Sequence, residues 1–160
     1  MKHLKFVLIA VAAMLVACND EPSEQPEVLI DVTPNNIAGV WMLDSYDGGA
    51  TLAEGSYVYI EFVRSEHTYT LYQNVGSMGV EVKQGRYYIE TDAELGAVIR
   101  GTYGTDEYDY AEWAHRYIVE MTADTMRWTA KDDREDVSVY RRIEALPELE
   151  ERWRVVFGLK

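Results

Sequence analysis

Apolar and polar residues alternate in short runs through most of the chain, and glycine, aspartate or serine separates the runs. Val80 and Val82, for example, each have polar neighbours. The interval between Asn35 and Leu146 contains no proline and all twelve tyrosines. This pattern is typical of a meander of antiparallel strands. It predicts eight strands, near Gly39–Tyr46, Tyr57–Arg64, Thr68–Asn74, Val80–Ile89, Leu95–Tyr103, Glu112–Met121, Met126–Lys131 and Val137–Ile143.

The pattern changes after Pro147, near the carboxyl end of the chain. Leu149, Trp153 and Val156 or Phe157 recur at helical spacing, and a proline suits the first turn of a helix. We therefore expect residues 144–160 to form a short C-terminal helix that packs its apolar stripe on the outside of the sheet. A helix that recruits a partner is the alternative.

The amino end has the layout of a secretory signal. Lys2 and Lys5 precede the apolar run Phe6–Val16, and the small residue Ala17 stands directly before Cys18. The run is too short to cross a bilayer of roughly 30 Å as a helix, and no later stretch approaches the roughly 20 apolar residues that a membrane helix needs. We therefore expect residues 1–17 to be removed.

Charge and cysteine content narrow the classes of function. The formal net charge is −13, and loss of Lys2 and Lys5 leaves 13 basic against 28 acidic residues, or −15. So acidic a surface repels phosphate backbones, which argues against a nucleic-acid partner. With one cysteine no disulfide forms within the chain, and the remaining 143 residues are long enough to bury a single core without one.

The segment Leu15-Val16-Ala17-Cys18 resembles the lipobox of bacterial lipoproteins. The resemblance implies that Cys18 carries acyl chains, which anchor the protein to the outer membrane of a Gram-negative bacterium. Residues 18–36 then form an acidic, flexible tether. The acidic run after Cys18 also resembles the surface-export signal of lipoproteins in the Bacteroidetes, which implies exposure at the cell surface. A plain solvated linker on a periplasmic protein is the alternative.

The first strand opens with Gly39-Val40-Trp41, which resembles the opening of lipocalins and of the lipocalin-like lipoproteins of the Bacteroidetes. The resemblance spans roughly residues 37–143 and implies an all-β, up-and-down barrel of eight antiparallel strands. It also implies that Gly39 lets the chain bend and that Trp41 closes the barrel floor. A late arginine, Arg141 or Arg142, then packs over the tryptophan ring. The short interval leaves open whether the interior is a ligand cavity or is filled by side chains.

The residues give little sign of catalysis. Cys18 is lipidated in this interpretation, and His67 and His115 have neither zinc-site spacing nor a nucleophile beside them, so we expect both on strand surfaces. No nucleophile elbow, phosphate loop or dinucleotide fingerprint is present in the sequence. Acidic pairs are common, but none has the spacing of a calcium loop. We therefore expect no enzyme activity, metal or cofactor.

The segment from Tyr103 to Trp113 combines aromatic and acidic residues at unusual density. Aromatic faces beside carboxylates can bind sugars or grip a cation, and tyrosines covering a barrel rim are the alternative. We expect ligand or partner contacts at Tyr103, Tyr108, Tyr110 and Trp113. The sequence thus favours a membrane-anchored binding module for a small apolar ligand. The alternatives are an accessory protein of a cell-envelope complex with a filled barrel and, less favoured, a surface glycan-binding protein.

Overall fold

The computed structural model describes residues 27–76, 79–104, 111–149 and 155–156. The predicted signal segment 1–17, the predicted lipidation site Cys18 and residues 19–26 of the predicted tether lie outside the described residues, as do Tyr108 and Tyr110. Within the described part of the chain, no helix is long and apolar enough to cross a membrane.

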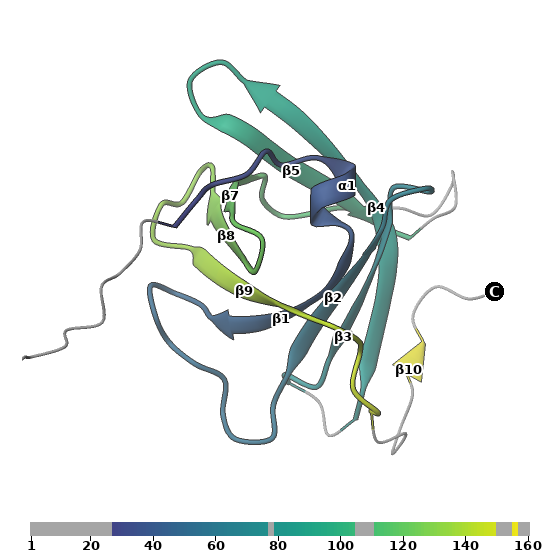
Figure 1. Ribbon diagram of the computed structural model, residues 1–160. Helices are drawn as coiled ribbons and strands as arrows, with labels where there is room; N and C mark the ends of the chain where they lie inside the picture. Colours follow the sequence, from purple (N-terminus) through teal and green to yellow (C-terminus); the bar gives the residue numbers. More distant parts are fainter. Residues whose placement is uncertain (1–26, 77–78, 105–110, 150–154, 157–160) are drawn as a thin grey trace, which may run out of the picture.

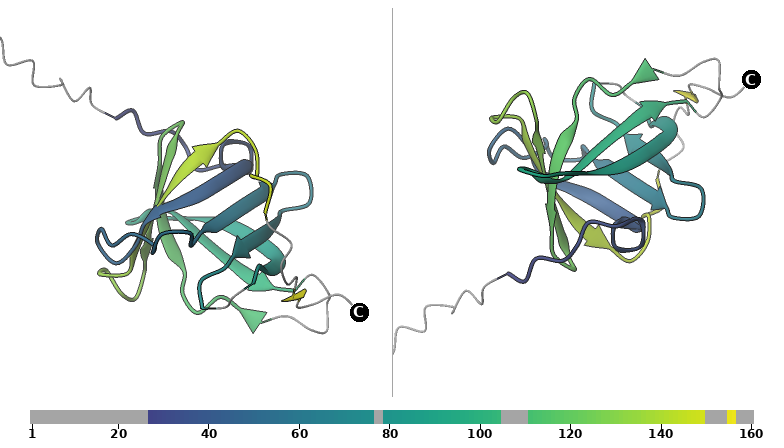
Figure 2. Two further views of the ribbon diagram at one scale, coloured as in Figure 1. Left: turned by 90° about the horizontal axis from the view of Figure 1, so that it is seen from below. Right: turned by 90° about the horizontal axis from the view of Figure 1, so that it is seen from above.

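Eight strands form one closed antiparallel barrel (Figure 1), and Figure 2 shows the same arrangement from below and above. The strands lie in the order β4-β3-β2-β1-β9-β8-β7-β5, and pairing of β5 with β4 closes the ring. Two further strands of two residues each, β6 and β10, pair at its edges. The strands are β1 Gly39–Ser45, β2 Val58–Val63, β3 Thr68–Gln73, β4 Glu81–Asp92, β5 Gly96–Tyr103, β6 Ala111–Glu112, β7 Tyr117–Met121, β8 Thr125–Ala130, β9 Val137–Ile143 and β10 Val155–Val156.

The alternation of the sequence sets which side chains enter the barrel. In β2, Val58, Ile60 and Phe62 are buried, whereas the residues between them are more exposed. Each strand pairs with its neighbour in a register that places such inward residues side by side, as Ile60 does with Trp41 on one side and Leu71 on the other. Successive residues of a strand point to opposite faces, so the buried set forms one core inside the barrel.

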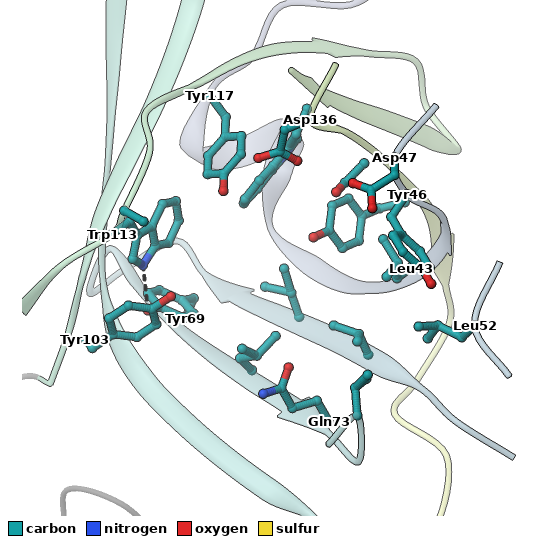
Figure 3. Close-up of a pocket in the computed structure, with 18 residues that line it drawn as sticks. Leu43, Tyr46, Asp47, Leu52, Tyr69, Gln73, Tyr103, Trp113, Tyr117 and Asp136 are labelled. Carbon is teal, nitrogen blue, oxygen red and sulfur yellow. Dashed lines mark hydrogen bonds between the residues drawn. The ribbon is translucent and has the colours of Figure 1, made fainter. Parts of the chain in front are cut away.

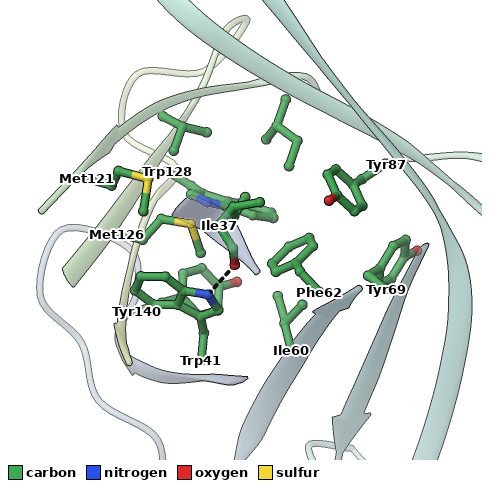
Figure 4. Packing of buried hydrophobic residues seen from close by; sticks show 12 residues of the cluster. Ile37, Trp41, Ile60, Phe62, Tyr69, Tyr87, Met121, Met126, Trp128 and Tyr140 are labelled. Atoms are coloured by element: carbon green, nitrogen blue, oxygen red, sulfur yellow. Dashed lines mark hydrogen bonds between the residues drawn. The ribbon is translucent and has the colours of Figure 1, made fainter. Parts of the chain in front are cut away.

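One end of the barrel is filled by large side chains, which we call the closed half (Figure 4). Its members face inward and are almost fully buried: Ile37, Trp41, Phe62, Tyr87, Ile99, Val119, Met121 and Met126. The short helix α1, Pro34–Ile37, lies at this end. Thr33 caps α1 by accepting a hydrogen bond from the Asn36 amide (3.2 Å), and Pro34 fits its first turn. The closed half is therefore a packed core with a helical plug.

Trp41 and Arg142 join α1 to the first and last strands of the barrel. The Trp41 Nε1–H donates to the Ile37 carbonyl at 2.8 Å. The Arg142 guanidinium lies 4.1 Å from the centroid of the Trp41 ring and donates to the backbone carbonyls of Ala38, Asn36 and Ala123. Gly39 has φ +112°, a conformation that favours glycine, and a Cβ there would lie 3.1 Å from the same guanidinium.

Of the two arginines that the sequence offered for this place, the structure puts Arg142 over the ring. The side chain of Arg141 is half exposed and reaches Asp44 at 3.8 Å.

The predicted strand Glu112–Met121 is divided into β6 and β7. Glu112 pairs with Thr102, and Tyr117 pairs with Ile99. Five residue steps from Glu112 to Tyr117 therefore correspond to only three steps along β5. The surplus residues leave the sheet between the two strands, and Trp113 lies at that point. Its amide still donates to the Gly101 carbonyl (2.9 Å).

The helix predicted within residues 144–160 is wrong wherever the structure describes that segment. Residues 144–149 are not helical, and Val155–Val156 forms β10, which pairs in parallel with Glu81 and Val82. The physical reason lies in β4: its pairing with β5 begins at Gly85, so one edge of Glu81 and Val82 is free, and two adjacent β-branched residues suit a strand better than a helix.

Candidate functional site

The other half of the barrel contains a cavity of about 440 Å³ (Figure 3), and we call this part of the molecule the cavity half. Ile60, Tyr69, Trp128 and Tyr140 belong both to the buried core and to the cavity lining, so they form the boundary between the two halves. Every barrel strand except β4 contributes to the lining, together with residues of the connecting loops. The lining residues are Leu43, Tyr46, Asp47, Leu52, Val58, Ile60, Tyr69, Leu71, Gln73, Val75, Tyr103, Trp113, Ala114, Tyr117, Trp128, Asp136, Ser138 and Tyr140.

Five lining residues form a continuous aromatic wall. Trp113 lies between Tyr69 and Trp128, with centroid distances of 5.2 and 5.6 Å, and Tyr117 and Tyr140 contact Trp128 at 5.2 and 5.3 Å. All four pairs are tilted or edge-to-face, and ring quadrupoles favour such geometries. Each ring of the wall therefore packs against at least one other ring.

Hydrogen bonds and glycines fix the position of Trp113 in this wall. The Trp113 Nε1–H donates to the Tyr69 hydroxyl at 2.8 Å, and that hydroxyl donates to the Thr102 carbonyl at 3.1 Å. A Cβ at Gly101 would lie 2.4 Å from the Trp113 ring, and one at Gly85 would lie 1.7 Å from the Thr102 carbonyl oxygen. The indole and the tyrosine thus occupy space that only glycine leaves free.

The phenol groups of the wall stay uncharged at neutral pH. Burial raises the pKa of Tyr117 to about 12, with a smaller contribution from the charge of Asp136. Burial likewise raises the pKa of Tyr69 and of Tyr140. Burial disfavours a phenolate, so these hydroxyls remain hydrogen-bonding groups without charge.

Aliphatic and polar residues complete the cavity. Val58, Ile60, Leu71 and Leu43 come from the inward positions of β1, β2 and β3, whereas Leu52 comes from the loop after β1. Gln73 lies at the end of β3 and donates to the Glu81 carboxylate at 2.6 Å. Figure 3 shows Asp47 and Asp136 on one side of the cavity, with Gln73 on the other. Such a lining has a mainly apolar body and a few polar groups at its edge.

Comparison with known families identifies this architecture. The family model of the lipocalin-like domain matches residues 37–128, which is more than half of the chain. The chain belongs to the lipocalin-like domain family. The match begins at Ile37 in α1 and ends at Trp128 in β8, and β9 then closes the barrel against β1. No curated protein and no solved structure matches the chain. Lipocalin-like domains are in general binding folds rather than enzymes, and the barrel is accordingly that of a binding module.

The lipocalin-like barrel brings together two of the four residues expected to contact a ligand. Tyr103 and Trp113 both line the cavity, and Tyr108 and Tyr110 lie outside the described residues. The sequence did not predict four further aromatic residues of the lining, Tyr69, Tyr117, Trp128 and Tyr140. Their inward positions in β3, β7, β8 and β9 carry the signal, because residues at alternate positions of neighbouring strands point into one barrel.

His67 and His115 lie in connections and not on the strand surfaces that the sequence predicted. His67 is in the turn between β2 and β3, with φ +54°, and His115 is in the loop before β7. His115 Nδ1 lies 2.8 Å from Asp132 Oδ1, which raises the pKa of the histidine. Among the described residues, no group of three or more histidine, cysteine, aspartate or glutamate side chains is placed to hold a metal ion.

Proposed function

We propose that the protein is a lipid-anchored lipoprotein whose lipocalin-like barrel binds a small, largely apolar ligand without chemical conversion. The observation that carries the ligand-binding part is the cavity of about 440 Å³. Ligand cavities in proteins commonly measure about 300–1,000 Å³ and combine an apolar lining with a few polar groups. The cavity half has this composition, and its volume suits a compact ligand.

The arrangement of the lining supports a flat or ring-shaped ligand. The aromatic wall offers ring faces and edges, and aliphatic side chains such as Leu71 and Val58 cover the remainder. Ser138, Gln73 and the tyrosine hydroxyls supply hydrogen bonds that orient a polar substituent.

The cavity weighs against the alternative of an accessory protein with a filled barrel, since only the closed half is filled. It also weighs against a surface glycan platform built on Trp113. That indole is packed among Tyr69, Tyr117 and Trp128, so its ring is part of an inner wall.

Binding of a neutral naphthylamine fluorophore tests the ligand-binding part. The purified domain should bind the dye with enhanced, blue-shifted emission. Leu71→Trp fills the cavity and should weaken binding by tenfold or more. Thr70→Trp is the matched control, because Thr70 directly precedes Leu71 in β3 and lies on the opposite face of the sheet. This variant should retain dye binding.

A second filling variant protects this test against misfolding. Ser138→Leu adds volume from β9, and a native circular dichroism spectrum and a cooperative unfolding transition qualify each variant. If the dye does not bind the parent protein, or binds equally well to folded Leu71→Trp and Ser138→Leu, the cavity is not a ligand site.

The anchor is proposed from the residues Leu15–Cys18 and from the entry of the chain into the barrel. The Ile30 amide donates to the Met121 carbonyl (2.9 Å), so the described chain begins beside the closed half. The proposed location is the outer membrane of a Gram-negative bacterium, with the cell surface and the periplasmic face as the two alternatives.

Labelled palmitate tests the anchor. It should be incorporated into the parent chain and not into Cys18→Ala. Protease treatment of intact cells should digest the domain if it is exposed at the surface, whereas protection would indicate a periplasmic location.

A further inference from the structure

The charged groups of the cavity lining all have one sign. Asp47 and Asp136 are its carboxylates, and among the described residues no lysine, arginine or histidine lines it. Residues 77–78 and 105–110, which lie outside the described residues, contain none of these basic types in the sequence. A ligand in this cavity therefore meets two carboxylates and no positive side chain among the described lining residues. The nearby imidazole of His115 does not line the cavity and pairs with Asp132 at 2.8 Å.

Asp136 is the better placed of the two carboxylates. It directly precedes β9, and its carbonyl accepts a hydrogen bond from the Ala130 amide at 2.9 Å, which fixes its backbone. Its side chain is half buried and lies near Tyr117 in the cavity (Figure 3). Asp136 forms no ion pair with another described residue, whereas Asp132 pairs with His115 at 2.8 Å.

Asp47 is held at the same side of the cavity by a tight turn. Tyr46 and Ala50 form an antiparallel bridge around it, and Asp47 itself has φ +46° in the left-handed region. The basic side chain of Lys83 approaches one lining residue, with its Nζ 5.7 Å from the centroid of the Tyr103 ring. It pairs with Glu81 at 3.1 Å, so its charge is compensated.

The aromatic wall favours the same type of ligand as these carboxylates. The face of an indole or phenol ring attracts cations, and the attraction increases where water is excluded. Trp113, Tyr117 and Trp128 supply such rings, and their hydroxyl and N–H groups carry no positive charge. An anion would face ring quadrupoles and carboxylates together.

We propose that the cavity selects ligands in which a compact apolar body carries one cationic group, an amine or quaternary ammonium. This group lies beside Asp136, on the side of the cavity where Asp47 also lies. The apolar body then lies against the aromatic wall. This proposal rests on the proposed function of the barrel as a ligand-binding module and names the chemical class that the module takes.

A matched series of naphthalene fluorophores tests this selectivity, with a neutral, a trimethylammonium and a sulfonate form. The cation should bind roughly tenfold more tightly than the neutral dye, and the anion more weakly, because an unscreened pair of charges a few ångströms apart differs by about that factor. Asp47→Asn with Asp136→Asn should abolish the preference for the cation, measured as the ratio of the affinities of the same variant for the cationic and the neutral dye.

The whole protein is acidic, so the control must separate local from general attraction. Glu66→Gln with Glu120→Gln removes the same two charges from exposed positions outside the lining, and it should retain the cation preference. The proposal is overturned if the neutral dye binds the cavity but the cation gains nothing over it, or if both double variants lower cation binding equally. Failure of the neutral dye to bind the parent would instead refute the proposed function.

Discussion

Several strands contribute to both halves of the barrel, but side chains fill only one of the two halves. In β2, Phe62 belongs to the closed half, Ile60 to the boundary and Val58 to the cavity lining, although all three are buried. The closed half also receives Ile37 from α1 and the guanidinium of Arg142 over Trp41. The cavity half has no such plug among the described residues. The filled core and the cavity thus differ in what closes each end of the barrel.

The largest expected effect comes from deleting a tryptophan in each half. Trp41→Ala should lower the free energy of unfolding by about 3–5 kcal/mol, because the ring is fully buried and its loss leaves a void in a packed core. Trp113→Ala should lower it by only about 1–2 kcal/mol, because that ring already borders a cavity that water can enter. Urea unfolding of both variants measures the difference, and equal losses would contradict the division into two halves.

The next effect separates two adjacent arginines. Arg142→Met should reduce the free energy of unfolding by about 1.5–3 kcal/mol, because three backbone carbonyls lose a charged donor. Arg141→Met should change it by less than about 0.5 kcal/mol, because that side chain is exposed and its contact with Asp44 is long. Thermal melts of the two single variants provide the comparison. Similar shifts in both would show that the guanidinium over Trp41 contributes no more than a surface charge.

The course of the strands could be predicted because it depends on local pattern. Alternation and turn residues located seven of the eight barrel strands to within a few residues, and the resemblance at Gly39-Val40-Trp41 indicated how the sheet closes. The remaining strand was predicted as Glu112–Met121, and its predicted start was wrong because β7 begins at Tyr117. The surplus residues around Trp113 are set by pairing with β5, which is a contact between distant parts of the chain. The predicted C-terminal helix is wrong at Val155–Val156 for a similar reason, since these residues pair with β4, another distant part of the chain.

The cavity was harder to predict than the strands. Whether inward side chains fill a barrel depends on the tilt and stagger of all strands, which no single segment reveals. Trp113 and Tyr103 stood out because an unusual aromatic and acidic segment contains them. Tyr69 did not, although its hydroxyl joins Trp113 to β5, because that partnership spans 44 positions of the chain.

A smaller effect is expected from the hydroxyl that holds the aromatic wall. Tyr69→Phe should lower the free energy of unfolding by about 1 kcal/mol, because the Trp113 Nε1–H and the Thr102 carbonyl each lose a partner. It should also weaken binding of the neutral dye, because Trp113 is then less well fixed. Tyr59→Phe is the control: it removes a hydroxyl from a neighbouring strand outside the lining, and both measurements should remain near the parent values.

The smallest effect concerns the rim of the cavity half, where His115 and Asp132 join the loop before β7 to the turn after β8. The hydrogen bond to Asp132, supported by the charges of Asp136 and Asp133, raises the pKa of His115 above 6.5. Because the protonated imidazole is the stabilised form, this contribution to folding is complete below the unfolded-state pKa. It is lost as pH rises through the higher folded-state pKa.

A titration of the His115 ring signals by NMR checks this, and Asp132→Asn should move the midpoint to lower pH. Asp124→Asn, which removes a charge beside Arg142 in the closed half, should leave the midpoint unchanged.

High salt should also lower the midpoint of the His115 titration, because His115 and Asp132 are exposed to solvent and their attraction is screened. The stability difference between Arg142→Met and its parent should respond less to salt, since it arises mainly from short hydrogen bonds. If salt affected the two ends equally, the rim and the closed half would be held by the same kind of force.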